Sequence, residues 1–296
     1  MTSTPITDNC AIPHYHAGSF WKRSWNEFKT NRLAVSALFF LIALILLSIF
    51  APFFSAYTYY DISLSIKNEP PSSLHWFGTD DLGRDIFIRV WYGARISLIV
   101  GLSAAFIDLI IGMLWGGIAA LAGGRTDEIM MRIVDILSAI PSLLVIIALM
   151  VVLGPGLHTI IIALTVLGWI TMARIVRGQL LQLKTQGYVL AARSLGAGFW
   201  HILFKHLFPN AIGPIIVTLT LTVPAAIFSE AFLSYMGLGV QAPIASWGTM
   251  ASDGLPALEY YPWRLFFPAS FISITMLAFN LVGDGMSDAF GKATRR

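Results

Sequence analysis

Residues 77–85 read FGTDDLGRD, in which Gly78 and Gly83 have the spacing of a phosphate-binding loop, G-x-x-x-x-G-K-[ST]. Such a loop ends in a Lys that reaches the phosphates and a Ser or Thr hydroxyl that holds magnesium. Arg84 and Asp85 occupy those two places here, and the two aspartates in the middle of the stretch would repel a polyphosphate. We therefore expect no nucleotide site in this stretch.

Other catalytic and metal-binding patterns are also missing from the sequence. The only cysteine is Cys10, which excludes an intramolecular disulfide and a cysteine-based metal site. The six histidines show neither a metal-ligand spacing nor a Ser-His arrangement within an apolar segment. We therefore expect no catalytic residue, no cofactor site and no metal site in this chain, which is then not an enzyme.

The elements that position these residues are predominantly apolar. Hydrophobic residues make up 56% of the chain and charged residues 12%, against about 25% charged in soluble proteins. The apolar residues form runs of the length that a transmembrane helix requires. The runs cover residues 33–54, 96–124, 136–173, 207–229 and 265–283, and the third allows two helices joined by a turn at 154–156. We predict an all-α integral membrane protein with six transmembrane helices.

The basic residues predict the orientation of these helices. Fourteen Lys and Arg residues fall on one side of the predicted spans and five on the other. The positive-inside rule places the richer side, with both termini, in the cytoplasm. The pI near 9.0 therefore reflects topology, and we expect no nucleic-acid partner. The predicted organisation is a cytoplasmic tail at 1–32, a first transmembrane helix at 33–54, an extracytoplasmic loop at 55–95, a core of five transmembrane helices at 96–285 and a cytoplasmic tail at 286–296.

The N-terminal tail carries an amphipathic pattern just before the first span. Phe20, Trp21, Trp25 and Phe28 recur at helical spacing with basic residues between them. The pattern predicts a helix in the membrane interface, in contact with lipid. The alternative is an ordinary basic flank with aromatic residues at the interface. The apolar run after it is 22 residues long, longer than that of a cleavable signal peptide, so we expect it to remain as an anchor.

Three acidic residues fall within or at the edges of the predicted spans: Asp108, Asp135 and Glu230. Acids inside a membrane are costly and often mark a substrate or ion pathway. The alternative is a structural role, in which they lie near helix ends or pair with Arg132, Arg174 or hydroxyl groups across the bundle. We favour the structural role, because charged networks that stabilise a fold also contain such acids.

The connection between the fourth and fifth spans is longer than a link between neighbouring helices needs. It includes YVLAARSLGAGFWHILFKHLFPN, residues 188–210. On a helix, Ala192 and Gly196 share one face, and small residues there would let another chain approach closely. Pro209 marks the expected entry to the next span. A surface helix without a partner is the alternative. The predicted face and its continuation consist of Ala191, Ala192, Leu195, Gly196 and Phe199.

This connection resembles the EAA loop of the permease subunits of ABC importers. Ala191, Ala192, Gly196 and Pro209 match the pattern of that loop at every spacing, whereas Leu190 stands where the family often has Glu. The resemblance extends over nearly the whole chain, which is similar to the C-type subunits of dipeptide, oligopeptide and nickel permeases. The other matching stretches are 77–85, 92–98, 140–142, 173–178, 237–239, 247–248 and 283–285.

The resemblance implies a type I ABC-importer permease fold with a cytoplasmic coupling helix, in the cytoplasmic (inner) cell membrane. It implies a second, B-type permease subunit around a peptide pathway and an extracytoplasmic peptide-binding protein that delivers the substrate. It also implies two ATPase subunits, which bind the ATP and magnesium. The residues that it assigns to the ATPase contact are Tyr188, Ala191, Ala192, Leu195, Gly196, Phe199 and Pro209.

Other functions stay open on the sequence alone. A permease of the same family for nickel or another small solute would share all the motifs above. An ion-coupled secondary transporter would use Asp135 or Glu230 as a proton relay, but that class often shows paired repeats, and none is visible here. A scaffold without transport activity would leave the long connection at 188–210 without a purpose.

Overall fold

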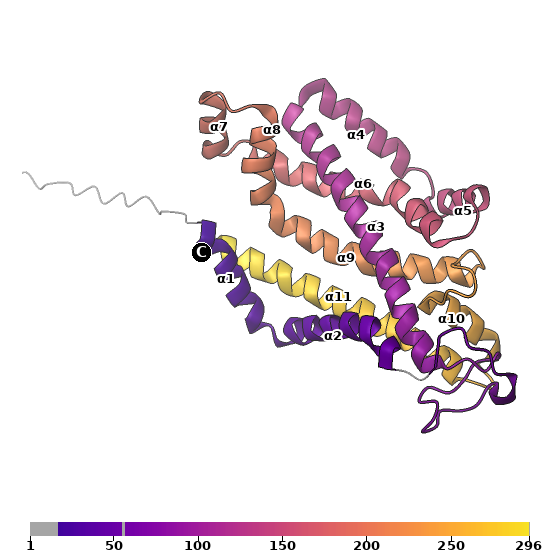
Figure 1. The fold of residues 1–296 in the computed structure, drawn as a ribbon. Coiled ribbons are helices and arrows are strands. Elements are labelled where there is room, and N and C mark those ends of the chain that lie inside the picture. Colours follow the sequence, from indigo (N-terminus) through magenta and orange to yellow (C-terminus); the bar gives the residue numbers. More distant parts are fainter. Residues whose placement is uncertain (1–16, 55–56, 296) are drawn as a thin grey trace, which may run out of the picture.

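The computed structural model describes residues 17–54 and 57–295, and Cys10 lies outside these ranges. The described residues form α-helices joined by short helical turns and loops, without a β-sheet (Figure 1). The helices are α1 (Ala17–Thr30), α2 (Arg32–Phe54), α3 (Ile86–Ala122), α4 (Gly124–Ser138), α5 (Ser142–Leu153), α6 (Leu157–Leu183), α7 (Gly187–Ser194), α8 (Phe199–His201), α9 (Phe208–Tyr235), α10 (Trp247–Gly254) and α11 (Trp263–Arg295).

Five helices are long and apolar enough to cross a membrane, and a bent pair, α4 with α5, makes a sixth candidate. The two helices of that pair meet at 78°. Pro141 starts α5, and a proline lacks the N–H that would continue α4 and disfavours helical geometry at Ile140 before it. The span that was predicted to begin at residue 136 therefore begins earlier, at Gly124, and is bent just before Pro141. The predicted turn at 154–156 is present between α5 and α6.

Several predicted boundaries were wrong because the helices continue past their apolar runs. The loop predicted at 55–95 ends at Asp85, since α3 begins at Ile86 rather than at residue 96. Its first turns carry Arg89 and Arg95, and Arg95 donates to the main-chain oxygens of Ser48 and Ile49 on α2 at 3.1 Å. At the other end of the chain, α11 continues to Arg295, through most of the predicted tail at 286–296.

The bundle is built around α3 and α6, which pack closely along their length (Figure 1). Gly112 and Gly116 of α3 make this approach possible, because a Cβ at either position would collide with Met172 or Ala173 of α6. Small residues of this kind let helices pack closely in membranes, where no hydrophobic force drives them together. On the other side of α3 lie α9 and α11, and α2 packs on α11.

The two ends of the bundle carry different elements (Figure 1). We call one end the α7 end: α1, α7, α8 and the C-terminal end of α11 gather there. The opposite end, which we call the α10 end, carries α10 and the loop at 57–85. Both ends of the described chain therefore lie at the α7 end, as an even number of crossings requires.

Candidate functional site

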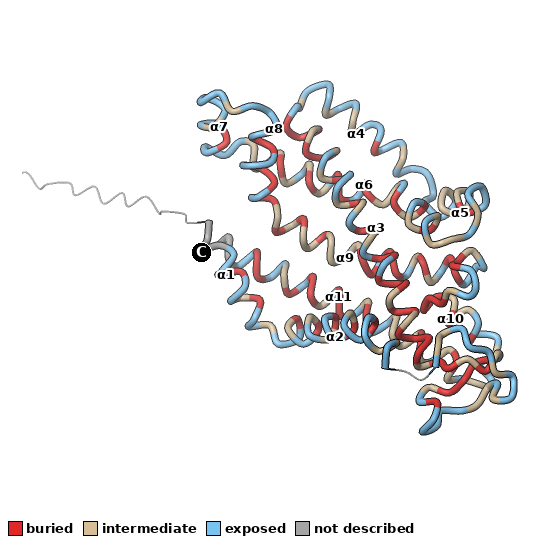
Figure 2. Tube along the Cα trace, viewed as in Figure 1, coloured by how far each residue is buried: buried red, intermediate tan, exposed pale blue. Residues whose placement is uncertain are grey.

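The short helix α7 stands out from the α7 end of the bundle with most of its surface exposed (Figure 2). Val189 is its only fully buried residue, and it packs in an apolar cluster with Leu180 of α6 and Leu203 and Leu207 of the segment after α8. One buried side chain thus anchors the helix. Its remaining side chains, including those of Ala191 and Ala192, are exposed or half-buried.

The glycine that follows α7 ends the helix instead of extending its face. Gly196 has φ of +83°, a backbone conformation that glycine adopts without strain. Its N–H donates to the Arg193 oxygen at 3.0 Å, and the N–H of Ala197 donates to the Ala192 oxygen at 3.0 Å. These two bonds form a Schellman cap. The prediction that Gly196 lies on one helical face with Ala192 was therefore wrong, since the helix ends at Ser194.

Apolar side chains are exposed on and beside α7. Leu195, directly after the helix, is 89% exposed. Tyr188, Leu190, Phe199 and Trp200 are between 37% and 55% exposed. We call this set of five residues the α7 surface. All five fall in the stretch 188–210, and three of them, Tyr188, Leu195 and Phe199, belong to the predicted ATPase contact.

Pro209 is the second residue of α9, in the first turn of that helix, where the sequence placed the entry to the next span. The helical path before it is continuous, because one span-length helix extends from Phe199 to Tyr235. Directly before it, residues Ile202–Leu207 form a π-helical segment. Proline has no N–H, so the regular i→i−4 pattern cannot continue through it, and the N–H of Phe208 bonds to the Leu203 oxygen, five residues back. Segments of this kind are rare and often occur at functional sites. This one connects the α7 surface to α9 without a break.

Polar contacts tie the base of α7 to three spans. Lys184, just before α7, donates to the Ala120 oxygen at the end of α3 at 2.8 Å. Arg177 of α6 holds Asp127 of α4 with two parallel bonds of 2.6 and 2.7 Å. Bidentate arginine–carboxylate pairs are among the strongest and most directional hydrogen-bonded pairs in proteins. Lys184 thus links the segment before α7 to α3, and Arg177 links α6 to α4.

Two of the three acids predicted in or near spans have protein partners. Asp135 of α4 accepts from Arg174 of α6 at 3.0 Å, across the bundle and not from Arg132 on its own helix. Glu230 of α9 is fully buried and accepts from three hydroxyl groups. Their donors are Ser97 of α3 at 3.1 Å, Ser234 of α9 at 2.9 Å and Ser246, at the start of α10, at 2.6 Å. Asp135 and Glu230 thus make the contacts with other side chains that a structural role predicts.

Asp108 is the exception among the three acids. Its side chain is only 3% exposed, in the middle of α3, and its Oδ1 has no hydrogen-bond partner among the described residues. It faces Gly168 of α6, where a Cβ would lie 2.8 Å from the Asp108 Cγ. The absence of a side chain at Gly168 thus makes room for the carboxyl group.

FGTDDLGRD forms a tight turn at the α10 end rather than a ligand loop. Asp80 accepts from Arg84 Nε at 2.7 Å and from Arg89, and from the main-chain N–H groups of Leu82 and Arg84. Asp85 is the N-cap of α3: it accepts from the Ile88 N–H at 2.9 Å, and its other oxygen contacts His75 at 2.7 Å. The carboxylates of Asp80 and Asp85 thus bond to main-chain and side-chain groups of the turn, to His75 and to Arg89 of α3.

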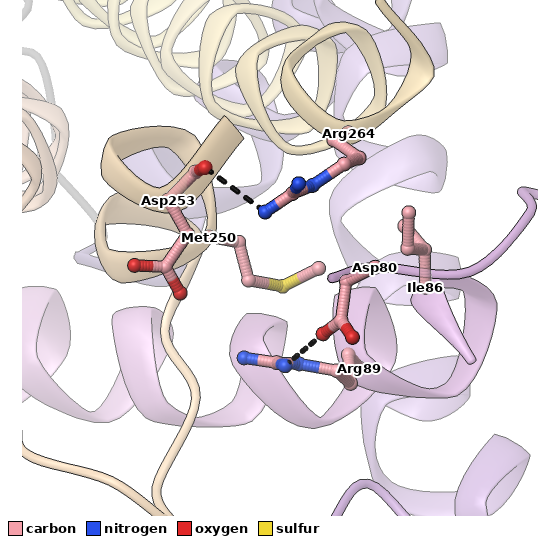
Figure 3. Close-up of a pocket in the computed structure, with 6 residues that line it drawn as sticks. All are labelled: Asp80, Ile86, Arg89, Met250, Asp253 and Arg264. Atoms are coloured by element: carbon pink, nitrogen blue, oxygen red, sulfur yellow. Dashed lines mark hydrogen bonds and ion pairs between the residues drawn. The ribbon is translucent and has the colours of Figure 1, made fainter. Parts of the chain in front are cut away.

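A small cavity lies between this turn and α10 (Figure 3). Arg89 and Arg264 reach into it from α3 and α11, with Met250 between them and Asp253 across from them (Figure 3). Arg264 also pairs with Asp81 at 3.0 Å. Burial raises the pKa of the Asp253 carboxyl, and the charge of Arg89 offsets part of that rise. The cluster joins three elements at the α10 end.

No group of three or more His, Cys, Asp or Glu residues that could hold a metal ion occurs in the part of the chain that the structure describes. Residues 109–296 match the family described as "Binding-protein-dependent transport system inner membrane component". Residues 19–71 match the N-terminal transmembrane domain of oligopeptide transport permease C. The chain belongs to this family of permeases.

Individual relatives agree with the family match. This permease is 64% identical over 278 residues to the oligopeptide transport system permease protein OppC of Bacillus subtilis, covering 94% of this chain and 91% of that protein. It is 57% identical over 279 residues to the dipeptide transport system permease protein DppC of the same organism, with coverage of 94% and 87%. For OppC of Escherichia coli K12 the identity is 40%, with coverage of 94% and 92%.

A solved structure shares the fold of the permease. A chain of the MetNI methionine ABC transporter, in an inward-facing conformation, superposes with a TM-score of 0.58 at 22% identity. The match covers 69% of this permease and 97% of that chain. The predicted type I importer fold, all-α with six candidate spans, is thereby confirmed.

Sequence reasoning missed the residues that hold these elements in place. No sequence feature distinguishes Val189 from the other apolar residues. Glu230 bonds to residues that are distant in sequence, such as Ser97. The cap at Gly196 had a local signal, because a glycine directly after a short helical pattern commonly ends it. The two arginines of the predicted 173–178 motif, Arg174 and Arg177, had no such signal for their partners on α4.

Proposed function

We propose that the chain is a transmembrane permease subunit of an ATP-driven importer that carries oligopeptides or dipeptides across the cytoplasmic membrane. The observation that carries this proposal is the 64% identity to an oligopeptide permease over 94% of the chain, with a dipeptide permease next at 57%. In this proposal the chain has no catalytic activity. Two separate ATPase subunits bind ATP and magnesium, a second permease subunit completes the pathway, and an extracytoplasmic binding protein delivers the peptide.

In this proposal the α7 end faces the cytoplasm. Basic residues gather in the elements of that end: Lys22 and Lys29 lie on α1, Lys184 and Arg193 lie at α7, and Lys205 lies in the π-helical segment. An excess of Lys and Arg in short connections is the usual mark of the cytoplasmic side. The loop at 57–85 and α10 then face the outside, where the binding protein docks.

We propose that α7 docks on one of the ATPases through the α7 surface, together with Ala191 and Ala192. An element that exposes apolar side chains and is anchored by the single residue Val189 has little reason to project from a bundle unless another protein covers it. Closure of the ATPase would push α7, and the contact of Lys184 with α3 and the pair of Arg177 with α4 would pass the movement to the spans.

Leu190 gives this contact a different chemistry from the acidic residue that the family often has there. Its side chain is 49% exposed beside Tyr188. A leucine contributes by removing apolar surface from water, at about 25 cal/mol per Å², and makes no charge-assisted bond. We therefore expect the contact at this position to be insensitive to salt.

The test is uptake of a radiolabelled peptide by proteoliposomes that contain the whole importer. In Ala192→Asp, a charge would be buried at the contact unless it finds a partner, so we expect uptake and substrate-stimulated ATPase activity to fall at least tenfold together. Assembly with the second permease subunit should persist, because Ala192 lies outside the bundle core. The matched control is Arg193→Ala, an exposed neighbour on α7, which should keep most of the uptake.

Two outcomes would contradict this proposal. Normal uptake by Ala192→Asp with the ATPases still bound would remove the docking role of α7. Peptide uptake that follows a proton gradient and needs no ATPase would favour a secondary transporter instead. Asp108, whose Oδ1 has no hydrogen-bond partner among the described residues, would then be the first residue to test.

A further inference from the structure

A groove of about 460 Å³ lies between α1 and α11 at the α7 end of the bundle. Trp21, Trp25 and Phe28 line it from α1, and Met286 and Phe290 line it from α11. Trp21 meets Phe290 edge to face, with 6.0 Å between ring centroids, and Trp25 stacks on Phe28 at 5.7 Å. The walls are thus aromatic and apolar, and the family match and the transport mechanism assign no role to them.

With α1 in the membrane interface, as its amphipathic pattern predicts, the groove would extend from the membrane surface into the hydrocarbon region. α1 ends at Thr30, Asn31 caps the next helix by accepting from the Ala34 N–H at 3.1 Å, and α2 begins at Arg32. Leu38, the groove residue on α2, lies six residues further on, which is about 9 Å along a helix axis. An interfacial amphipathic helix reaches about 5–10 Å below the headgroups. One groove therefore passes through both regions of a bilayer leaflet.

Ser24 of α1 is the polar residue among those that line the groove, and exposed lysines flank it on the same helix. Ser24 lines the groove, is 4% exposed, and its Oγ has no hydrogen-bond partner among the described residues. Lys22 and Lys29 are exposed on the same helix, and Lys29 Nζ lies 5.4 Å from the centre of the Trp25 ring. An occupant therefore needs a long apolar part, an oxygen that accepts from Ser24, and a negative charge near the two lysines.

The size of the groove argues against a helix of a partner protein. A helix with its side chains is about 10 Å across, so a volume of 460 Å³ would hold only about one turn. Part of this volume is open to solvent, and a hydrocarbon chain is narrow enough to lie along such an open groove. Stable attachment of one acyl chain to a surface usually needs a second, electrostatic signal, and the two lysines provide it.

We propose that this groove binds one anionic phospholipid of the surrounding leaflet. One acyl chain lies between α1 and α11 against Met286 and Phe290. An ester or phosphate oxygen accepts a hydrogen bond from Ser24, and the headgroup pairs with Lys22 and Lys29. The lipid would fix α1, and through it the start of α2, against α11. This inference does not depend on the identity of the transported substrate.

The test is native mass spectrometry of the full-length chain, purified with whatever subunits accompany it and supplied with phosphatidylglycerol or phosphatidylcholine. We expect one retained phosphatidylglycerol per copy of the chain and at least tenfold weaker retention of phosphatidylcholine. Met286→Trp fills the groove and should abolish retention. The double variant Lys22→Gln with Lys29→Gln should weaken it about tenfold, since each basic residue contributes attraction to an anionic surface.

A matched control keeps the test specific. Leu46→Trp adds the same indole to an exposed position of α2, 49% accessible and outside the groove, and should retain the lipid. If Met286→Trp fails to fold, the two lysine substitutions on the exposed side of α1 still decide the question. Equal retention of both lipids, or unchanged retention in the double lysine variant, would overturn the proposal. A crosslink from the variant Met286→Cys to another protein subunit would also overturn the proposal.

Discussion

The α10 end and the α7 end of the bundle are both made of connections between spans, but they are held in opposite ways. At the α10 end, Asp80 and Asp85 are each bonded to several groups, and Glu230 joins α3, α9 and α10 through three serines. At the α7 end, α7 has one buried anchor, Val189, and a cap that depends on Gly196.

The difference shows how one chain divides rigidity between its two ends. A connection whose polar groups bond within the chain keeps its own shape, and removing one partner leaves others buried and unpaired. A connection whose apolar groups are exposed gains stability only when another surface covers them. The first kind suits a fixed outer frame, and the second suits an element that must be moved by a separate subunit.

The largest effect is expected from the α10 end. Asp80→Ala would leave Arg84 and Arg89 buried without their carboxylate, and breaking a buried ion pair in this way costs about 3–5 kcal/mol. We expect Asp80→Ala to lower the melting temperature in detergent strongly or to prevent accumulation.

Asp81→Ala is the matched control: its carboxylate is 53% exposed, and its partner Arg264 keeps bonds to Asn68 and to the Asp253 main-chain oxygen. Its loss should therefore cost less than about 1 kcal/mol. Equal effects of the two substitutions would mean that Asp80 does not organise this end.

A smaller effect is expected at Glu230. Glu230→Leu removes the acceptor of Ser97, Ser234 and Ser246, and unsatisfied buried groups cost about 1–3 kcal/mol each, so we expect a loss on the order of 3 kcal/mol in stability. Glu230→Gln keeps an acceptor oxygen and should retain most of the peptide uptake. Stability is read from thermal unfolding and uptake from proteoliposomes. Loss of uptake in a stable Glu230→Gln would instead indicate that the acid relays protons.

The smallest effect is expected at the cap of α7. Gly196→Ala places a side chain at φ of +83°, which costs about 1 kcal/mol, although nothing lies within 4 Å of the added carbon. We expect faster hydrogen exchange at the Ala197 amide, which completes the cap. Gly198→Ala, at φ of −71° and also in open space, should leave that exchange unchanged. Identical exchange in both variants would show that the cap does not limit α7.

Much of the fold could be predicted from the sequence because membrane spans have a strong local signal. Long apolar runs indicated four of the six candidate spans directly, and the turn at 154–156 divided a fifth run into the other two. The boundaries could not be predicted in the same way. Arg89 and Arg95 interrupt the apolar run of α3, yet they are helical because their partners come from the loop before α3 and from α2. The bend at Pro141 had a local signal that the length of the apolar run concealed.

The candidate site was predictable where its pattern is short and was not where it depends on distant contacts. The stretch around Ala191 and Ala192 was singled out by its spacing and by its resemblance to the loop of the family, and its contact with an ATPase stays a prediction. The pairing of Asp135 with Arg174 could not be predicted in the same way. Arg132 and Arg174 are both within plausible reach of Asp135 until the angle between α4 and α6 is known. The groove beneath α1 had only its amphipathic pattern as a signal, and its depth is set by α11.

The central claim is that the α7 surface contacts an ATPase while the α10 end does not. It is tested most directly with a photo-crosslinking amino acid in the assembled importer, placed at Leu195 or, as a matched control, at Leu74. Both are highly exposed leucines, at 89% and 73%, at opposite ends of the bundle. We predict that Leu195 yields an adduct with an ATPase subunit and Leu74 yields none. An ATPase adduct from Leu74, or none from Leu195 while the ATPases co-purify, would contradict the account.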